Sequence, residues 1–225
     1  MFIGHFGLGF AARALAPRTS LGTLLLAAQW IDLMWPTLLL LGIERVVIDP
    51  SLPGLTPLAF VHYPYTHSLA AVLGWALLLG GAYFAVTRYA RGAWVVGALV
   101  ASHWLLDALV HRADLPLAFD GAARIGLGLW QSAPAAAIAI EVLIFVGGVL
   151  LFWRAFAAQA SGRARWGAAA LIALLALIHV GNLTGPPPPS VQAIAWVGQA
   201  QWLLVLAGYA LDRRPRALQP SPAAS

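Results

Sequence analysis

Long apolar runs, separated by short polar or turn-forming segments, follow one another along the whole chain. Several runs approach the ~20 residues that a helix needs to cross a bilayer. Proline, glycine and arginine mark the places where the runs stop, because the first two end helices and the third favours water. The pattern predicts a short first helix over 2–16 and six longer helices over 20–41, 67–87, 93–112, 134–153, 166–183 and 191–211. We therefore expect an all-α, polytopic transmembrane bundle of about seven helices.

The connections between these runs are too short to separate two folding units. The longest, IERVVIDPSLPGLTPLAFVHYPY, is rich in Pro and Gly, which is typical of loops. A second connection, LPLAFDGAARIGLGLWQSAP, is expected to contain a short interfacial piece. We predict a single transmembrane helical domain over 1–215 and a disordered tail over 216–225.

The composition supports a membrane protein and narrows the chemistry. Hydrophobic residues make up 61% of the 225 positions and charged residues only 9%, whereas a soluble domain is roughly a quarter charged. The first residues, MFIGHFGLGF, lack a positively charged start, so we expect no cleavable signal peptide. Because the chain has no cysteine, any metal must be held by histidine, aspartate or glutamate.

The net charge of +5 comes from arginine alone, since the chain contains no lysine. The arginines are dispersed at the predicted helix ends, so we interpret them as topology signals rather than as a nucleic-acid surface. Ten fall on one side of the predicted bundle: Arg13, Arg18, Arg88, Arg91, Arg154, Arg163, Arg165, Arg213, Arg214 and Arg216. Three fall on the other: Arg45, Arg112 and Arg124. This split predicts a multi-pass protein of a bacterial-type inner membrane with a cytoplasmic C-terminus. Whether the short first helix crosses fully is left open.

A polar stripe interrupts the apolar helix in ASHWLLDALVHRADLP. His103, Asp107 and His111 recur every four residues and so share one helix face. A charge in mid-membrane costs about 2.5–3.5 kcal/mol, so Asp107, and Asp32 in AAQWIDLMWP, must be paired, protonated or bound to a cation. With the predicted topology, several ionisable groups share one depth in the outer half of the bilayer: His5, Asp32, His67, His103 and Asp107.

Histidine and aspartate one helical turn apart, as His103 and Asp107 are, can reach a single ion. A chance HxxxD, or an internal hydrogen-bonded pair, is the alternative, but the convergence at one depth favours a shared metal. The THS triplet could also be a helix start, with Thr66 capping and Ser68 bonding locally. Asp32 could instead hold two helices together through hydrogen bonds. We expect His111 to lie at the rim of the site. Glu141 and His179 are more easily explained by structural roles.

These residues also occur in a recognisable order. GHFGLGF with His5, WIDLMWP with Asp32, YTHSL with His67 and Ser68, and HWLLD with His103 and Asp107 follow one another over residues 1–115. The order resembles the membrane-bound metal-dependent hydrolases, also described as LexA-binding, inner-membrane-associated hydrolases. Members often carry Pro-Asp-x-Asp where this chain has one carboxylate, Asp32. Either Asp32 suffices, or a further ligand comes from Glu44 or His62.

The resemblance and the spacing together predict a hydrolase that uses zinc or another divalent metal. We expect His67, His103 and Asp107, with Asp32 or His5, to bind the ion. The remaining carboxylate of Asp32 and Asp107 would act as general base or orient the metal-bound water, and Ser68 would hold a ligand or stabilise an oxyanion.

A site near the headgroup boundary favours a lipid ester, amide or phosphoester, attacked by metal-activated water. The alternative is a proton- or ion-coupled transporter, since buried Asp, Glu and His also mark ion paths, although no inverted repeat is evident.

Overall fold

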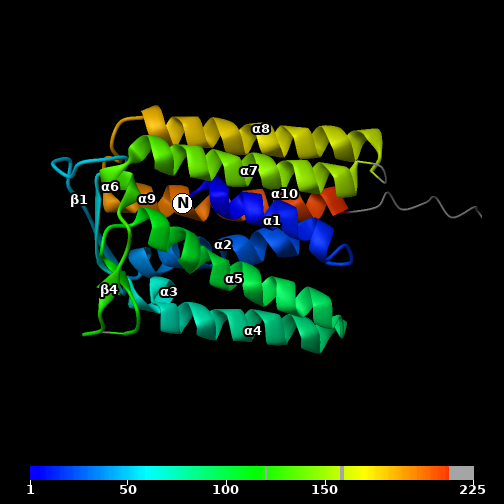
Figure 1. The fold of residues 1–225 in the computed structure, drawn as a ribbon, viewed down its shortest axis with the longest axis horizontal. Coiled ribbons are helices and arrows are strands. Elements are labelled where there is room, and N and C mark those ends of the chain that lie inside the picture. Colours follow the sequence, from blue (N-terminus) through cyan, green and yellow to red (C-terminus); the bar gives the residue numbers. More distant parts are fainter. Residues whose placement is uncertain (120, 158–159, 213–225) are drawn as a thin grey trace, which may run out of the picture.

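The protein is a bundle of long helices that run side by side (Figure 1). The computed structural model describes residues 1–119, 121–157 and 160–212. In order, the helices are α1 (Ile3–Leu15), α2 (Leu21–Leu40), α3 (Pro64–His67), α4 (Leu69–Thr87), α5 (Ala90–Val110), α6 (Leu129–Ser132), α7 (Pro134–Phe156), α8 (Gly162–Thr184), α9 (Val191–Gln199) and α10 (Gln201–Asp212). The predicted all-α fold class is confirmed. The predicted tail and the end of the predicted domain lie outside the described residues.

Six stretches of the described chain are long and apolar enough to cross a membrane: Leu21–Leu40, Leu69–Thr87, Ala90–Val110, Pro134–Phe156, Gly162–Thr184 and Val191–Asp212. Helix α1, with 13 residues, is shorter than the ~20 that a full crossing needs. Apolar side chains on the outside of the bundle are highly exposed, as for Leu77, Val86 and Trp94. Such a surface belongs in lipid rather than in water. The chain is therefore a polytopic membrane protein.

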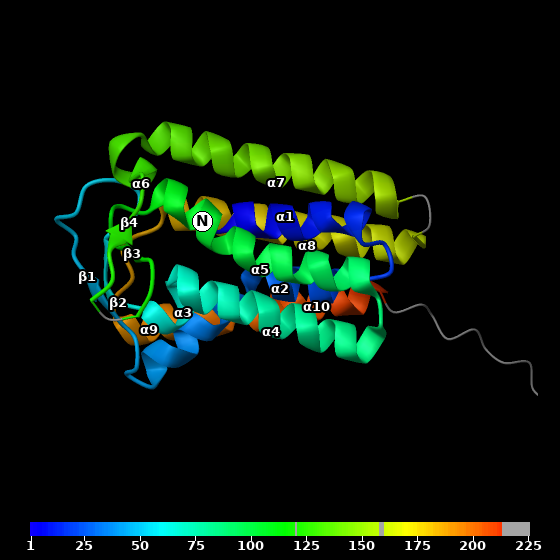
Figure 2. The same cartoon turned by 60° about the horizontal axis from the view of Figure 1, so that its bottom comes forward.

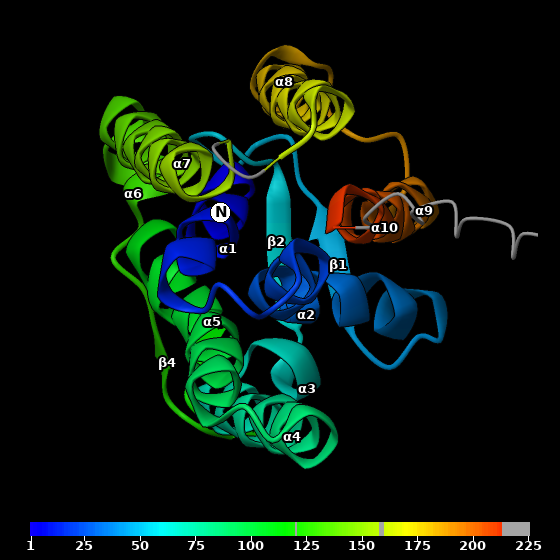
Figure 3. The same ribbon diagram turned by 90° about the vertical axis from the view of Figure 1, so that its right-hand side faces the viewer.

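Helix α1 lies inside the bundle, between α7 on one side and α2 and α5 on the other (Figure 3). Glycines allow α1 to approach α7 closely: a Cβ on Gly148 would lie 1.9 Å from the carbonyl oxygen of Gly7. At the start of α1, Glu141 of α7 accepts hydrogen bonds from the backbone N–H groups of Phe2 and Gly4. His5 lies between these contacts in the sequence, so they fix its position.

The two largest apolar clusters of the described residues meet along α1 and α2. One joins α2 to α4 and α5 and includes Leu24, Ile31, Val72, Val100 and Trp104. The other joins α1 and α2 to α7 and α8 and includes Phe6, Phe10, Leu25, Phe152 and Leu175. Polar side chains of α1, α2 and α5 therefore face one another between two dry regions.

Two small antiparallel hairpins occupy one end of the bundle (Figures 1 and 2). Strand β1 (Arg45–Ile48) pairs with β2 (Leu58–His62), and β3 (Leu115–Pro116) pairs with β4 (Arg124–Ile125). The predicted loops thus contain strands that the Pro/Gly-rich composition did not reveal. The second predicted connection contains the single turn α6 (Leu129–Ser132), and an interfacial position for it stays a prediction. The last predicted helix is divided at Ala200 into α9 and α10.

The turns α1–α2, α4–α5 and α7–α8 lie at the end of the bundle opposite the hairpins (Figure 1). Of the ten arginines predicted on one side, the seven that the structure describes are in or next to these turns. The three predicted on the other side, Arg45, Arg112 and Arg124, are at or next to the hairpins. Arg213, Arg214 and Arg216 lie outside the described residues. The division of charge between the two ends follows the prediction, and which end faces the cytoplasm stays a prediction.

Candidate metal centre

Helix α5 presents His103 and Asp107 to the interior, as their spacing predicts. Both side chains are buried. Nδ1 of His103 lies 3.0 Å from the carbonyl oxygen of Ala28 in α2. A carbonyl oxygen only accepts hydrogen bonds, so Nδ1 carries the proton, and Nε2 of the neutral ring is left with a lone pair. Among the described residues this buried Nε2 has no hydrogen-bond partner.

His67 and Asp32 reach the same point from two other elements. His67 ends the single turn α3, where the chain changes direction before α4 begins. Asp32 lies eight residues before the end of α2, about 12 Å along the helix axis. Nε2 of His67 is 3.5 Å from Oδ1 of Asp32 and 3.9 Å from Oδ2 of Asp107. Nε2 of His103 is 3.6 Å from Oδ1 of Asp32 and 3.3 Å from Oδ2 of Asp107.

These four separations fit a shared ion better than they fit hydrogen bonds. An N–H···O hydrogen bond normally spans 2.7–3.2 Å, so separations of 3.3–3.9 Å are long for direct bonding. Two ligands of a tetrahedral zinc ion, each about 2.1 Å from the metal, are about 3.4 Å apart. The two carboxylates also bring two negative charges to the cluster; the ammonium group of Met1 offsets one of them at Asp107, and a bound cation would offset the other.

His5 joins the cluster from α1. Its ring stacks on that of His103, with centroids 3.7 Å apart and planes 6° from parallel. Its Nε2 is 3.2 Å from Oδ1 of Asp107, and that oxygen also forms an ion pair, at 2.5 Å, with the N-terminal ammonium group of Met1. Asp107 therefore turns one oxygen toward His5 and the other toward His67 and His103.

Within the described chain, two sets of side chains place one ligand atom each within 4.8 Å of the others. One set is His5, His103 and Asp107, and the second is Asp32, His67 and His103. His103 belongs to both, so the sets form one continuous cluster of five residues. Asp32 is its most accessible member, with 22% of its side chain exposed against 5% or less for the other four. The cluster is therefore most exposed at Asp32.

The side chains of Ser68, a predicted catalytic residue, and Glu44, a possible further ligand, make hydrogen bonds beside the cluster. The Ser68 hydroxyl accepts a hydrogen bond from the backbone N–H of Ala71 and so caps α4. Glu44, considered as a replacement ligand, is buried and accepts hydrogen bonds from Tyr65 and Thr66. It belongs to neither of the two sets of described residues that could hold a metal ion.

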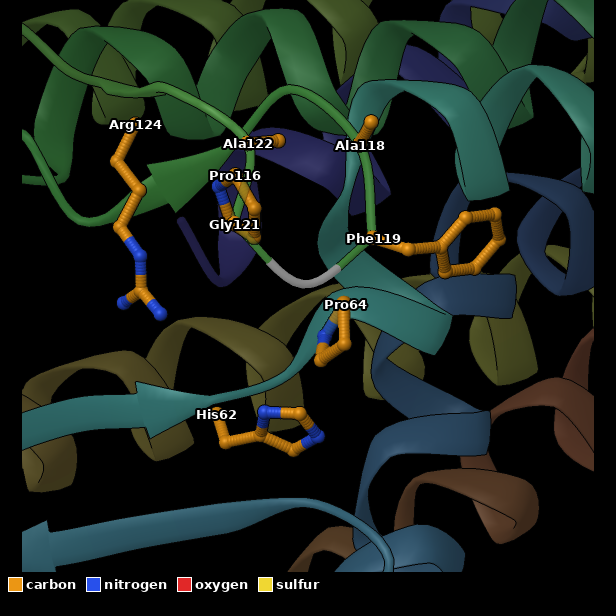
Figure 4. Close-up of a pocket in the computed structure, with 8 residues that line it drawn as sticks. All are labelled: His62, Pro64, Pro116, Ala118, Phe119, Gly121, Ala122 and Arg124. Atoms are coloured by element: carbon orange, nitrogen blue, oxygen red, sulfur yellow. The ribbon is translucent and has the colours of Figure 1, made fainter.

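His62, the other replacement ligand considered, lies in β2 at the end of the bundle. There it lines a cavity of about 20 Å³ together with Arg124 and the loop around Phe119 (Figure 4). That volume accommodates a water molecule but not a substrate. His62 is likewise in neither metal-binding set of the described chain.

His111 continues the α5 stripe but faces a separate group. Its Nδ1 is 3.1 Å from Oδ1 of Asp114, and that carboxylate also accepts a hydrogen bond from the Tyr63 hydroxyl. Burial raises the pKa of the Tyr63 phenol, and the Asp114 carboxylate raises it further, so the phenol stays protonated and donates. We expected His111 at the rim, and the structure buries it against Phe60 and Trp130.

Glu141 and His179 are buried in α7 and α8. The bonds from Glu141 to the start of α1 agree with the structural role expected for it. The sequence did not reveal the partners that orient the two central histidines, Ala28 for His103 and Thr66 for His67. A backbone carbonyl carries no sequence signal, and Thr66 was interpreted only as a possible helix cap.

No protein-family model, curated protein or solved structure matches this chain. The resemblance over residues 1–115 accordingly stays a prediction. The fold and the cluster themselves define the class: a polytopic membrane protein with buried His/Asp groups that could hold a metal ion.

Proposed function

We propose that the protein is an integral membrane metal-dependent hydrolase, with zinc as the expected ion. The observation that carries the proposal is the set of Nε2-to-carboxylate separations of 3.3–3.9 Å. They match ligands that surround one ion, and the tautomer of His103 leaves its Nε2 available. The resemblance to the membrane-bound metal-dependent hydrolases supports the same conclusion from the order of the motifs.

Four side chains supply the proposed ligands: His67, His103, Asp32 and Asp107. Bound there, a divalent ion supplies Lewis-acid polarisation of a substrate oxygen and acidifies water. His5 supports the centre by stacking on His103 and fixing one oxygen of Asp107. Asp32 presents Oδ1 to the proposed ion, and because it is the most accessible member of the cluster, its second oxygen would exchange a proton with water or substrate as the general base.

The substrate proposed is an ester, amide or phosphoester of a lipid. The cluster lies between helices that are apolar on their outer faces, about two turns from the end of the bundle that carries the hairpins. A substrate with an acyl chain could remain in the bilayer while its polar linkage reaches Asp32. The arginine distribution supports placing this end on the outer side of the membrane.

Hydrolysis is tested with purified protein in lipid nanodiscs, given panels of lipid esters, amides and phosphoesters. We expect cleavage in one panel, its loss on chelation and its return with zinc. His103→Ala and Asp32→Asn should each lower the rate at least 100-fold, while His179→Ala, a buried histidine on α8, should leave it within about twofold. Zinc-loaded protein that cleaves no panel, or cleavage that survives His103→Ala, contradicts the proposal.

A further inference from the structure

Glu44 lies in the turn after α2 and is buried although it is a carboxylate. Oε1 accepts hydrogen bonds from the backbone N–H groups of Tyr65, at 2.8 Å, and Thr66, at 2.9 Å. Oε2 accepts one from the Thr66 hydroxyl at 2.7 Å. Three donors offset the cost of burying the charge, and all three belong to the turn that carries His67.

The Thr66 hydroxyl lies between Glu44 and His67. It is 2.7 Å from Oε2 of Glu44 and 2.7 Å from Nδ1 of His67. A hydroxyl has one hydrogen, and a carboxylate can only accept it. With that hydrogen directed to Glu44, the hydroxyl oxygen accepts from His67, so Nδ1 of His67 carries a proton. The lone pair of the neutral ring is then on Nε2, the atom that faces Asp32 and Asp107.

We propose that Glu44 and Thr66 are positioning residues that hold His67 in its Nδ1–H tautomer and so make Nε2 available as a metal ligand. The proposal deepens the metal centre described above and rests on it for its functional meaning. Orienting hydrogen bonds of this kind, on the far nitrogen of a ligating histidine, govern both ring direction and basicity.

His103 provides an internal comparison. Its Nδ1 is held by the backbone carbonyl of Ala28, which cannot donate. Thr66 differs, because a hydroxyl can also donate, and alone it would permit either tautomer of His67. Glu44 removes that ambiguity by taking the hydroxyl hydrogen. This assigns a task to a carboxylate that is buried beside the cluster without belonging to it.

The first test needs no metal. Protein labelled with ¹⁵N in the histidine rings is measured in metal-free form by NMR, at an alkaline pH where imidazole is neutral. His67 is assigned by the signals lost in His67→Asn. We expect a protonated Nδ1 and an unprotonated Nε2. A proton on Nε2 overturns the proposal, and it does so whether or not the cluster binds an ion.

The second test reverses the direction of the hydrogen bonds that join Glu44, Thr66 and His67, with little change in side-chain shape. In Glu44→Gln, the amide oxygen stays with the two backbone N–H groups, and the amide NH₂ faces Thr66 as a donor. The hydroxyl then donates to His67, which moves the ring proton to Nε2. We expect the inverted tautomer in the ¹⁵N spectrum and a 10- to 100-fold weaker zinc affinity. Thr66→Ser, which keeps the hydroxyl, should retain both wild-type values.

A Glu44→Gln protein with the wild-type tautomer overturns the proposal, even if zinc binding weakens, because Glu44 would then act only in folding. If that variant does not fold, the wild-type ¹⁵N spectrum decides. If His67 has the Nδ1–H tautomer but the protein takes up no metal, the proposed function is contradicted. The positioning role of Glu44 and Thr66 would still hold.

Discussion

His103 shows how a residue type and its spacing predict part of a site and leave the rest undetermined. The four-residue interval placed His103 and Asp107 on one face, which the structure confirms. Which ring nitrogen faces the cluster depends on the carbonyl of Ala28, 75 positions away in sequence. The same holds for His67, whose orientation depends on Glu44. The sequence allowed five residues to be grouped by their order and depth, but the tautomers of His67 and His103 follow from tertiary contacts.

Ser68 provides a prediction at this scale, because its hydroxyl has both a structural and a predicted catalytic role. Ser68→Ala removes the N-cap of α4, so we expect the free energy of unfolding to fall by about 1 kcal/mol. Metal content and hydrolysis should be unchanged. Ser161→Ala, which uncaps α8 in the same way, is the matched control for stability. A 100-fold loss of rate at full metal content would instead assign Ser68 to catalysis.

Helices were predictable as elements because each is an apolar run bounded by residues that stop helices. The predicted 20–41 and 191–211, for example, correspond to Leu21–Leu40 and Val191–Asp212. The hairpin β1–β2 was not predictable, since its strands are short and their pairing is not local. The division at Ala200 also lacked a sequence signal. Nearby, Gly198 of α9 packs against Pro36 of α2, a contact that only the fold reveals.

Glycines on both helices allow α1 and α7 to pack closely. Gly148→Ala would place a methyl group 1.9 Å from the Gly7 carbonyl oxygen, so α1 must move away and carry His5 with it. We expect a loss of about 1–3 kcal/mol in stability and weaker zinc binding. Gly147→Ala, one position earlier with nothing within 4 Å of its Cβ, is the control.

Unfolding midpoints and zinc titrations of both variants check this prediction. If Gly148→Ala matches Gly147→Ala in both measurements, the close approach of α1 and α7 does not position His5. The account of how α1 enters the cluster would then be wrong.

For the whole molecule, the apolar surface establishes a bilayer setting, and the arginines at the two ends predict its orientation. Composition was sufficient for the first conclusion, because lipid-facing side chains dominate the sequence. The structure does not show which end of the bundle faces the cytoplasm, so the orientation stays a prediction. The proposed outer location of the centre depends on it.

Orientation is checked with single cysteines, since the chain has none of its own. Pro187→Cys, between α8 and α9, and Gly162→Cys, at the start of α8, lie at opposite ends of one span and are both exposed. In intact cells, an impermeant thiol reagent should label Pro187→Cys and spare Gly162→Cys. The reverse labelling would place the centre on the cytoplasmic side.

We propose that His67, His103, Asp32 and Asp107 bind one metal ion, with His5 packed against them. Elemental analysis of protein purified without chelators tests it most directly. We predict about one equivalent of zinc or another divalent metal in the wild type and in His179→Ala, and its loss in His103→Ala and Asp107→Ala. Wild-type protein that is folded and free of metal, or metal that survives both substitutions, would contradict the account.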